Sequence, residues 1–200
     1  CYVYGDGIRI TEGRLYIQNV GQVRNFQHRA IPDQAEFKMV ILKRDDLDNW
    51  YAAFQLELPD SAPAPIIDPA VGIDMGLASF ATLSTGEHID NPRWFRSAEQ
   101  KLAVLQRRRA RCQRSSCQYR ELTRQIRRLH EHITNQRRDF HHKVSTQLVR
   151  RFGFIAVEDL NVNGLCRSHV SKSMGDAGWG SFLGMLSYKA ANAGKTVVKV

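Results

Sequence analysis

The pattern of apolar and polar positions makes the first part of the chain strand-rich. Residues 50–58 alternate with a period of two, which predicts a half-exposed strand. Residues 37–42, apolar except for Lys38, form a second run of strand length. Two shorter strand-like segments at residues 8–10 and 14–17 flank a glycine turn. Several short strands at this spacing predict a small barrel or sandwich across residues 1–58. Its acidic cluster at residues 45–48 lies in a predicted turn, and no carboxylate pair or histidine cluster lies on the strands, so we expect this segment to bind or to support rather than to catalyse.

A proline-rich segment follows. Residues 59–65 hold three prolines among serine and alanine, a composition typical of a semi-rigid linker. With residues 59–69 as the linker, the chain divides into a first domain at residues 1–58 and a second at residues 70–200.

The second domain opens with two predicted buried strands in residues 71–83. A tight turn at Gly76 joins them, and Asp74 ends the first strand. Thr85 and Gly86 mark the next turn, and residues 87–90 predict a third short strand. An aspartate at such a position is costly to bury unless it is paired or holds a metal. We therefore interpret the rest of the chain as the structure that surrounds a functional site at Asp74.

Residues 94–152 change to a helical pattern. One apolar stripe runs along a helix of roughly thirty residues, with spacings of four, three, four, seven, four and four. A similar stripe begins on a preceding helix at Leu102 and Leu105, and the pair Ser115 and Ser116 marks the break between the helices. The pattern predicts a helical hairpin. The stripe of the longer helix consists of Leu122, Ile126, Leu129, Ile133, Phe140, Val144 and Leu148.

These helices are strongly basic. Between Arg93 and Arg151 there are roughly seventeen Lys or Arg residues against about four acids, within a chain of net charge +9 and pI about 9.7. Like charges one turn apart destabilise a helix, so a phosphate backbone is the expected counterion. No run of about 18 apolar residues exists, so we expect no membrane span. The candidate nucleic-acid-binding residues are Arg107, Arg108, Arg109, Arg127, Arg128, Arg137 and Arg138.

The same helices contain histidines and cysteines that we do not expect to bind zinc. The four cysteines form no CxxC pair and are expected to be free thiols. The histidines His130, His132, His141 and His142 are expected to face solvent or phosphate.

A second carboxylate follows the helices. Residues 154–160 predict an apolar strand that ends in Glu158 and Asp159. Successive side chains of a strand point to opposite faces, so the two cannot share one site unless the strand has ended before them. Asp176 is a candidate N-cap for a helix from residue 177 to about 193, and a last strand begins at Thr196. The chain ends inside that strand, so we expect it to be a fragment.

The order of these elements matches a ribonuclease-H-like domain, a mixed sheet whose first and fourth strands are neighbours. Asp74 ends the first strand and Glu158 the fourth, so the two carboxylates would face each other at the strand tips. Two-metal cleavage of a phosphodiester needs such a cluster, and hard oxygen ligands suit Mg²⁺ or Mn²⁺. The motif at residues 72–76 also resembles the first phosphate loop of actin-like ATPases, but that alternative gives the arginines no role.

Three motifs and the basic helices together resemble TnpB, the OrfB-type protein of bacterial insertion sequences and a relative of type V CRISPR effectors. The motifs are GIDMGLASFATLSTGEHIDNPRWFR, IAVEDLNVNGL and DAGWGSFLGMLSYKAANAGKTVVKV. The resemblance implies a RuvC-like nuclease domain over residues 70–200, with the arginine-rich hairpin inserted at about 94–152. It also implies a wedge-like or OB-like β-barrel at residues 1–58.

The resemblance further implies an RNA-guided DNA endonuclease, long labelled a transposase, with guide RNA and target DNA as partners in a bacterial or archaeal cytoplasm. Asp74 matches the first RuvC aspartate and Glu158 the second-motif glutamate, whereas Asp159 has no counterpart. These two residues would hold two Mg²⁺ or Mn²⁺ ions. The third aspartate, a zinc ribbon with structural Zn²⁺ and a helical recognition part would lie outside residues 1–200.

Two alternatives remain open. Some relatives have lost catalytic carboxylates and act as RNA-guided repressors, so a catalytically inactive DNA-binding protein is the second hypothesis. A DNA-strand transposase is the third, although the chain shows no recognisable tyrosine or histidine pair for that chemistry.

Overall fold

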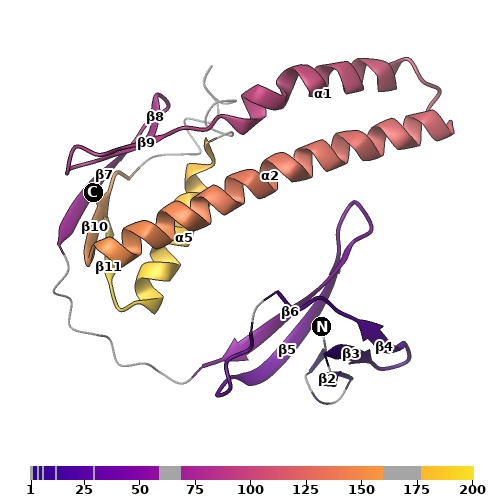
Figure 1. Ribbon diagram of the computed structural model, residues 1–200, viewed down its shortest axis with the longest axis horizontal. Coiled ribbons are helices and arrows are strands. Elements are labelled where there is room, and N and C mark those ends of the chain that lie inside the picture. The colour runs from indigo at the N-terminus through magenta and orange to yellow at the C-terminus, as the bar shows by residue number, and fades with distance from the viewer. Residues whose placement is uncertain are drawn as a thin grey trace. The chain divides into compact units, whose positions relative to one another are not determined.

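A computed structural model describes the chain except for residues 1, 4, 6, 12, 29, 59–68 and 160–176. Its residue contacts divide the chain into two compact units, Cys1–Ser61 and Ala62–Val200, and each unit is described by itself (Figure 1). The proline-rich linker predicted at residues 59–69 lies outside the described residues, apart from Pro69. No helix of the described residues is long and apolar enough to cross a bilayer.

The first unit consists of two three-stranded antiparallel sheets, with strand orders β1-β5-β6 and β2-β3-β4. One apolar cluster joins them, because Ile8 and Leu15 of one sheet pack with Val40 of the other. The two sheets therefore share a core, and closure into the expected barrel stays a prediction. The strands are β1 (Tyr2–Val3), β2 (Ile8–Thr11), β3 (Arg14–Ile17), β4 (Gly21–Arg24), β5 (Glu36–Arg44) and β6 (Trp50–Glu57).

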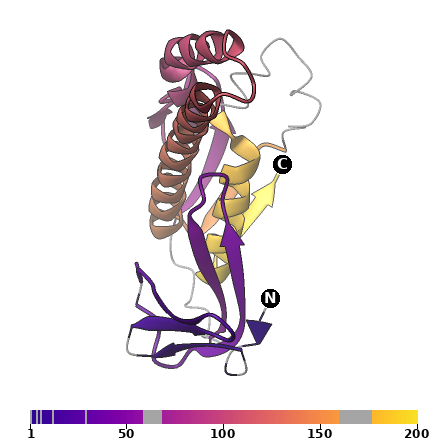
Figure 2. The ribbon, with the colours of Figure 1, turned by 90° about the vertical axis from the view of Figure 1, so that its right-hand side faces the viewer.

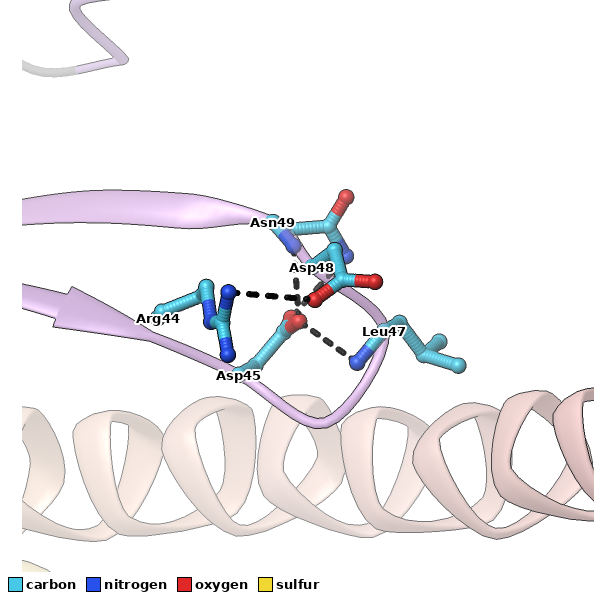
Figure 3. A network of polar contacts seen from close by, with 5 residues as sticks. All are labelled: Arg44, Asp45, Leu47, Asp48 and Asn49. Carbon is cyan, nitrogen blue, oxygen red and sulfur yellow. Dashed lines mark hydrogen bonds and ion pairs between the residues drawn. The ribbon is translucent and has the colours of Figure 1, made fainter.

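An aspartate closes the turn between β5 and β6 (Figure 3). Asp45 Oδ1 accepts hydrogen bonds from the backbone N–H groups of Leu47 and Asn49, both at 2.8 Å, and Oδ2 accepts one from Asn49 Nδ2 at 2.9 Å. Burial raises the pKa of Asp45, but the hydrogen bonds from Asn49, Leu47 and Tyr51 outweigh it and hold the pKa below its ordinary value. The carboxylate of Asp45 thus stabilises the turn that joins β5 to β6.

The second unit contains a five-stranded mixed sheet with strand order β11-β10-β7-β8-β9. The strands β7, β8 and β9 form an antiparallel meander, whereas β10 is parallel to both β7 and β11. The strand predicted to carry Glu158 therefore lies beside the strand that carries Asp74, as expected. The strands are β7 (Ala70–Met75), β8 (Ser79–Leu83), β9 (His88–Asp90), β10 (Phe154–Val157) and β11 (Thr196–Lys199).

Among the described residues, two helices cover one face of this sheet, α2 (Cys117–Arg151) and α5 (Trp179–Asn192) (Figures 1 and 2). Inward-facing strand residues such as Ile73 and Ile155 pack with Leu148 and Phe182 from the helices in one core. The opposite face presents the alternate strand positions, which include Asp74. The side chains of the candidate site thus lie on the face away from α2 and α5.

The 35-residue α2 is about 52 Å long and serves two cores. Its first half packs on α1 (Trp94–Ala110) in a separate apolar cluster, and its second half packs on the sheet. The helix begins after Ser116, whose Oγ accepts a hydrogen bond from the Tyr119 N–H at 3.1 Å. The predicted break at Ser115 and Ser116 is confirmed. The cluster between the helices consists of Leu102, Leu105, Leu122 and Ile126.

Two local expectations need correction. Helix α5 has Gly178 as its N-cap, with φ 65°, so the prediction of Asp176 as the cap is wrong, and Asp176 itself lies outside the described residues. Gly76 does not adopt a left-handed backbone conformation. A Cβ at Gly76 would lie 3.0 Å from the Ser79 carbonyl oxygen, a contact tighter than ordinary van der Waals distance, so the close approach favours glycine there. In the next turn, between β8 and β9, Gly86 does adopt the left-handed conformation, with φ 86°.

Candidate active site

The register of two parallel strands brings Asp74 and Glu158 to neighbouring positions. Ile73 of β7 lies beside Val157, the last residue of β10, so the residues that follow them, Asp74 and Glu158, lie at the carboxyl end of the same strand pair. Ile73 and Val157 are buried, whereas both carboxylates are exposed on the other face. Adjacent strands are about 4.8 Å apart, so the two side chains are direct neighbours across the sheet.

A pocket of about 430 Å³ lies on this face, and both carboxylates line it. Gly72 and Ala156 lie beside each other two residues before the carboxylates, and their small size leaves the pocket open. The lining residues are Gly72, Ile73, Asp74, Thr82, Leu83, Ser84, Ala156, Glu158 and Val200.

Asp159 takes no part in this pocket. Its backbone N–H donates to the Val200 carbonyl at 2.8 Å, and its carboxylate lies 3.8 Å from Lys199 Nζ. The neighbouring acids Glu158 and Asp159 thus have different surroundings, which makes Asp159 a natural comparison residue.

The donor set of the pocket suits a hard divalent cation, because carboxylate oxygens are the preferred ligands of Mg²⁺ and Mn²⁺. Among the described residues, no group of three or more His, Cys, Asp or Glu side chains could hold a metal ion. The part of the chain that the structure describes therefore offers a pair of oxygen donors, Asp74 and Glu158, which fits part of such a site.

A third polar position lies beside the carboxylates. Thr82 of β8 pairs with Asp74 across the antiparallel ladder and lines the same pocket. Its Oγ1 lies 3.2 Å from Nδ1 of His88 on β9. Residue type alone does not single out Thr82 and His88 in the sequence. The sequence did contain one signal for this pair, the turn at Gly86. The position of that turn sets the strand register, and the register pairs Thr82 with His88.

The predicted arginines lie on α1 and α2. Five are exposed, whereas Arg109 and Arg137 are partly buried. The guanidinium carbon of Arg109 lies 5.7 Å from the centre of the Tyr119 ring, and Arg137 lies against Gly178 at the start of α5. The exposed arginines are Arg107, Arg108, Arg127, Arg128 and Arg138.

The expectation that His141 faces solvent or phosphate is wrong. His141 is 1% exposed, and its Nε2 donates to the Ala177 carbonyl at 2.9 Å. Burial lowers the pKa of His141, the hydrogen bond to Ala177 raises it, and the nearby charges of Arg137 and His142 lower it, with a net decrease. His141 is buried because it lies next to Phe140 on the side of α2 that packs against the core of the second unit.

The second unit is a mixed α/β domain with two strand-end carboxylates in one pocket. Residues 53–169 match the OrfB_IS605 family, described as "Probable transposase". The match covers more than half of the chain, and the chain belongs to this family of TnpB-type proteins.

Two relatives carry the same kind of name. A "Putative RNA-guided DNA endonuclease" of Streptomyces pristinaespiralis is 38% identical over 173 residues, which make up 86% of this chain and 43% of that protein. The "Putative RNA-guided DNA endonuclease InsQ" of Escherichia coli is 29% identical over an alignment of 218 residues, covering 100% of this chain and 54% of that protein. The chain thus spans about half the length of these curated relatives.

A solved structure shares the fold. The chain superimposes on a protein from the "Cas12f1-sgRNA-target DNA complex" with a TM-score of 0.56 and 14% sequence identity. The likeness covers 83% of this chain and 36% of that chain, and it shows a common fold.

Proposed function

We propose that the chain acts in an RNA-guided, divalent-metal-dependent DNA endonuclease of the TnpB type, with residues 70–200 as a RuvC-like, ribonuclease-H-like domain. The observation that carries the proposal is the register of β7 and β10, which places Asp74 and Glu158 side by side on one open pocket. The names of the relatives and the fold shared with the Cas12f1 complex support it.

In this proposal Asp74 and Glu158 are the metal-binding carboxylates. Two Mg²⁺ or Mn²⁺ ions bound there would activate the attacking water and stabilise the leaving oxygen of the phosphodiester. The hydrogen-bonded strands β7 and β10 hold both carboxylates in place on the sheet. The small residues Gly72 and Ala156 leave space for a nucleic-acid backbone to approach the carboxylates.

The arginines of α1 and α2 would contact the backbone of a guide RNA–target DNA heteroduplex. Arginine binds phosphate oxygens through two parallel hydrogen bonds and remains charged at any physiological pH. Such contacts hold the duplex in position without reading its sequence, which base pairing with the guide RNA would supply.

The proposal is tested by neutralising each carboxylate at constant size. In the protein expressed from its natural gene with the flanking DNA, Asp74→Asn and Glu158→Gln should each lower target-DNA cleavage by more than about a hundredfold, because each removes a direct ligand charge. RNA binding, measured by filter retention, should change by less than about twofold, because the arginines remain.

Asp159→Asn is the matched control, because it neutralises the adjacent acid outside the pocket and should leave cleavage near the unmodified level. Equal losses of cleavage and RNA binding would reject the catalytic assignment. Tight, RNA-dependent DNA binding without cleavage by the unmodified protein would favour the repressor hypothesis instead.

A further inference from the structure

Four polar residues form a row across the open face of the sheet. Asp74 pairs with Thr82, and Thr82 pairs with His88, while Glu158 lies beside Asp74 on the other side. The row therefore runs from the residue that follows β10 across the neighbouring strands β7, β8 and β9. His88, at its outer end, is exposed on the edge strand.

The ring of His88 is held by its neighbour. Thr82 Oγ1 lies 3.2 Å from His88 Nδ1, so one ring nitrogen is engaged by the threonine hydroxyl. When that hydroxyl donates to Nδ1, the neutral ring carries its proton on Nε2. The Nε2–H group of the exposed ring is then available to a ligand.

An ion pair fixes the turn that precedes β9. Arg151 at the end of α2 lies 2.8 Å from the Glu87 carboxylate, which ties this turn to the helix-covered side of the sheet. Because successive side chains along an extended chain point in opposite directions, this contact leaves His88 on the open face. The position of His88 is thus determined both by Thr82 and by the anchor at Glu87.

The chemistry that fits this group is a phosphate oxygen. A nucleic-acid strand that reaches Asp74 and Glu158 brings its own negative charge to two carboxylates, and a hydrogen-bond donor beside them offsets part of the repulsion. His88 lies two strands from Asp74, about 10 Å away at ordinary strand spacing, so it would meet a phosphate beside the reacting one.

We propose that Thr82 and His88 form a phosphate-binding element for the DNA strand that is cut, with His88 as the contacting residue and Thr82 as a positioning residue. The identification of that strand rests on the proposed nuclease function. The contact itself is a binding property, so it can be measured without cleavage.

The test is binding of a fluorescent single-stranded DNA to the full chain without divalent metal, together with ¹⁵N NMR of the histidine rings. His88→Ala should weaken DNA binding by about tenfold, the effect of one charge-assisted hydrogen bond, and His88→Gln should retain part of the affinity. Thr82→Val should weaken binding like His88→Ala, whereas Thr82→Ser should restore it. The Nε2 signal of His88 should shift when DNA is added.

His28→Ala is the matched control, because His28 is also exposed but belongs to the first unit, and it should leave DNA binding unchanged. In the cleaving protein the His88 variants should raise the KM for DNA more than they lower kcat. Weaker DNA binding in a protein that cuts nothing would support the element while the nuclease proposal fails. The phosphate-binding element would be disproved if His88→Ala left DNA binding and the KM for DNA unchanged. It would also be disproved if the substitution weakened RNA binding alone.

Discussion

At the scale of single residues, His141 is the polar group most deeply enclosed by aromatic rings. Its ring lies 5.5 Å from Phe80 of β8 and 5.7 Å from Phe182 of α5, measured between ring centres. Nε2 is bound to the Ala177 carbonyl, whereas Nδ1 has no hydrogen-bond partner among the described residues. A second proton would therefore place an unpaired charge in the core, beside the cationic Arg137.

We expect this histidine to make the domain less stable in acid. The pKa of His141 is lower in the folded state, so below about pH 6.5 the unfolded chain takes up a proton that the folded chain does not. The free energy of unfolding should thus fall as the pH decreases from about 6.5 toward the folded pKa, by at most about 1.4 kcal/mol per pH unit. Urea unfolding between pH 5 and pH 8 measures this.

His141→Gln keeps a donor for the Ala177 carbonyl but cannot titrate, so its unfolding free energy should depend less on pH. His130→Gln, at an exposed position of the same helix, should retain the slope of the unmodified chain. An equal slope in His141→Gln would show that other groups cause the acid sensitivity.

At the scale of elements, the connection between β7 and β8 determines where Asp74 stands. The Gly76 N–H donates to the Phe80 carbonyl at 3.3 Å, and a side chain at Gly76 would press on the Ser79 carbonyl oxygen at 3.0 Å. The hairpin that carries Asp74 therefore depends on a glycine for steric space, and the following hairpin depends on Gly86 for its left-handed conformation.

Gly76→Ala should destabilise the chain by about 1–3 kcal/mol, because the added Cβ meets a backbone oxygen that cannot move freely. Gly184→Ala in α5 is the opposite case, since nothing lies within 4 Å of its Cβ position. That substitution should stabilise the chain by about 0.5–1 kcal/mol. Urea unfolding compares the two, and a neutral Gly76→Ala would disprove the close approach.

At the scale of the whole molecule, we expect the position of the positive charges to matter more for nucleic-acid binding than the net charge. The chain carries a net charge of +9, but some of its cations are already paired with acids. Lys38 lies 2.7 Å from Glu57, Arg44 lies 3.7 Å from Asp48, and Lys143 lies 2.6 Å from Asp139. We expect the exposed arginines of α1 and α2, rather than these paired cations, to carry the salt-dependent binding of nucleic acid.

The triple variant Arg107→Gln, Arg108→Gln and Arg128→Gln should therefore make the slope of log affinity against log salt less steep by about two. Each lost phosphate contact reduces the steepness by about 0.7–0.9. The measurement is RNA or duplex binding across a series of salt concentrations.

The control variant Lys38→Gln, Arg44→Gln and Lys143→Gln removes the same net charge from paired positions and should leave the slope nearly unchanged. Equal slopes in both triple variants would show that net charge alone governs binding.

The sequence by itself determined the order of the main helices and strands, although β7 and β10 end at Met75 and Val157 and not at the predicted carboxylates. The period of the apolar positions predicted α2 and its inward stripe, and Ser116 marked its start, because helix geometry and capping depend on residues within one or two turns. The placement of Asp74 and Glu158 after apolar runs likewise follows from local pattern, and so does the candidate carboxylate pair.

Only the tertiary structure decided which side chains became neighbours. The row from Glu158 to His88, the burial of His141 and the close approach at Gly76 all depend on segments that pair or pack across the fold. Local sequence cannot specify these contacts, because strand register and helix docking are set by the combined burial of residues that are far apart in the chain.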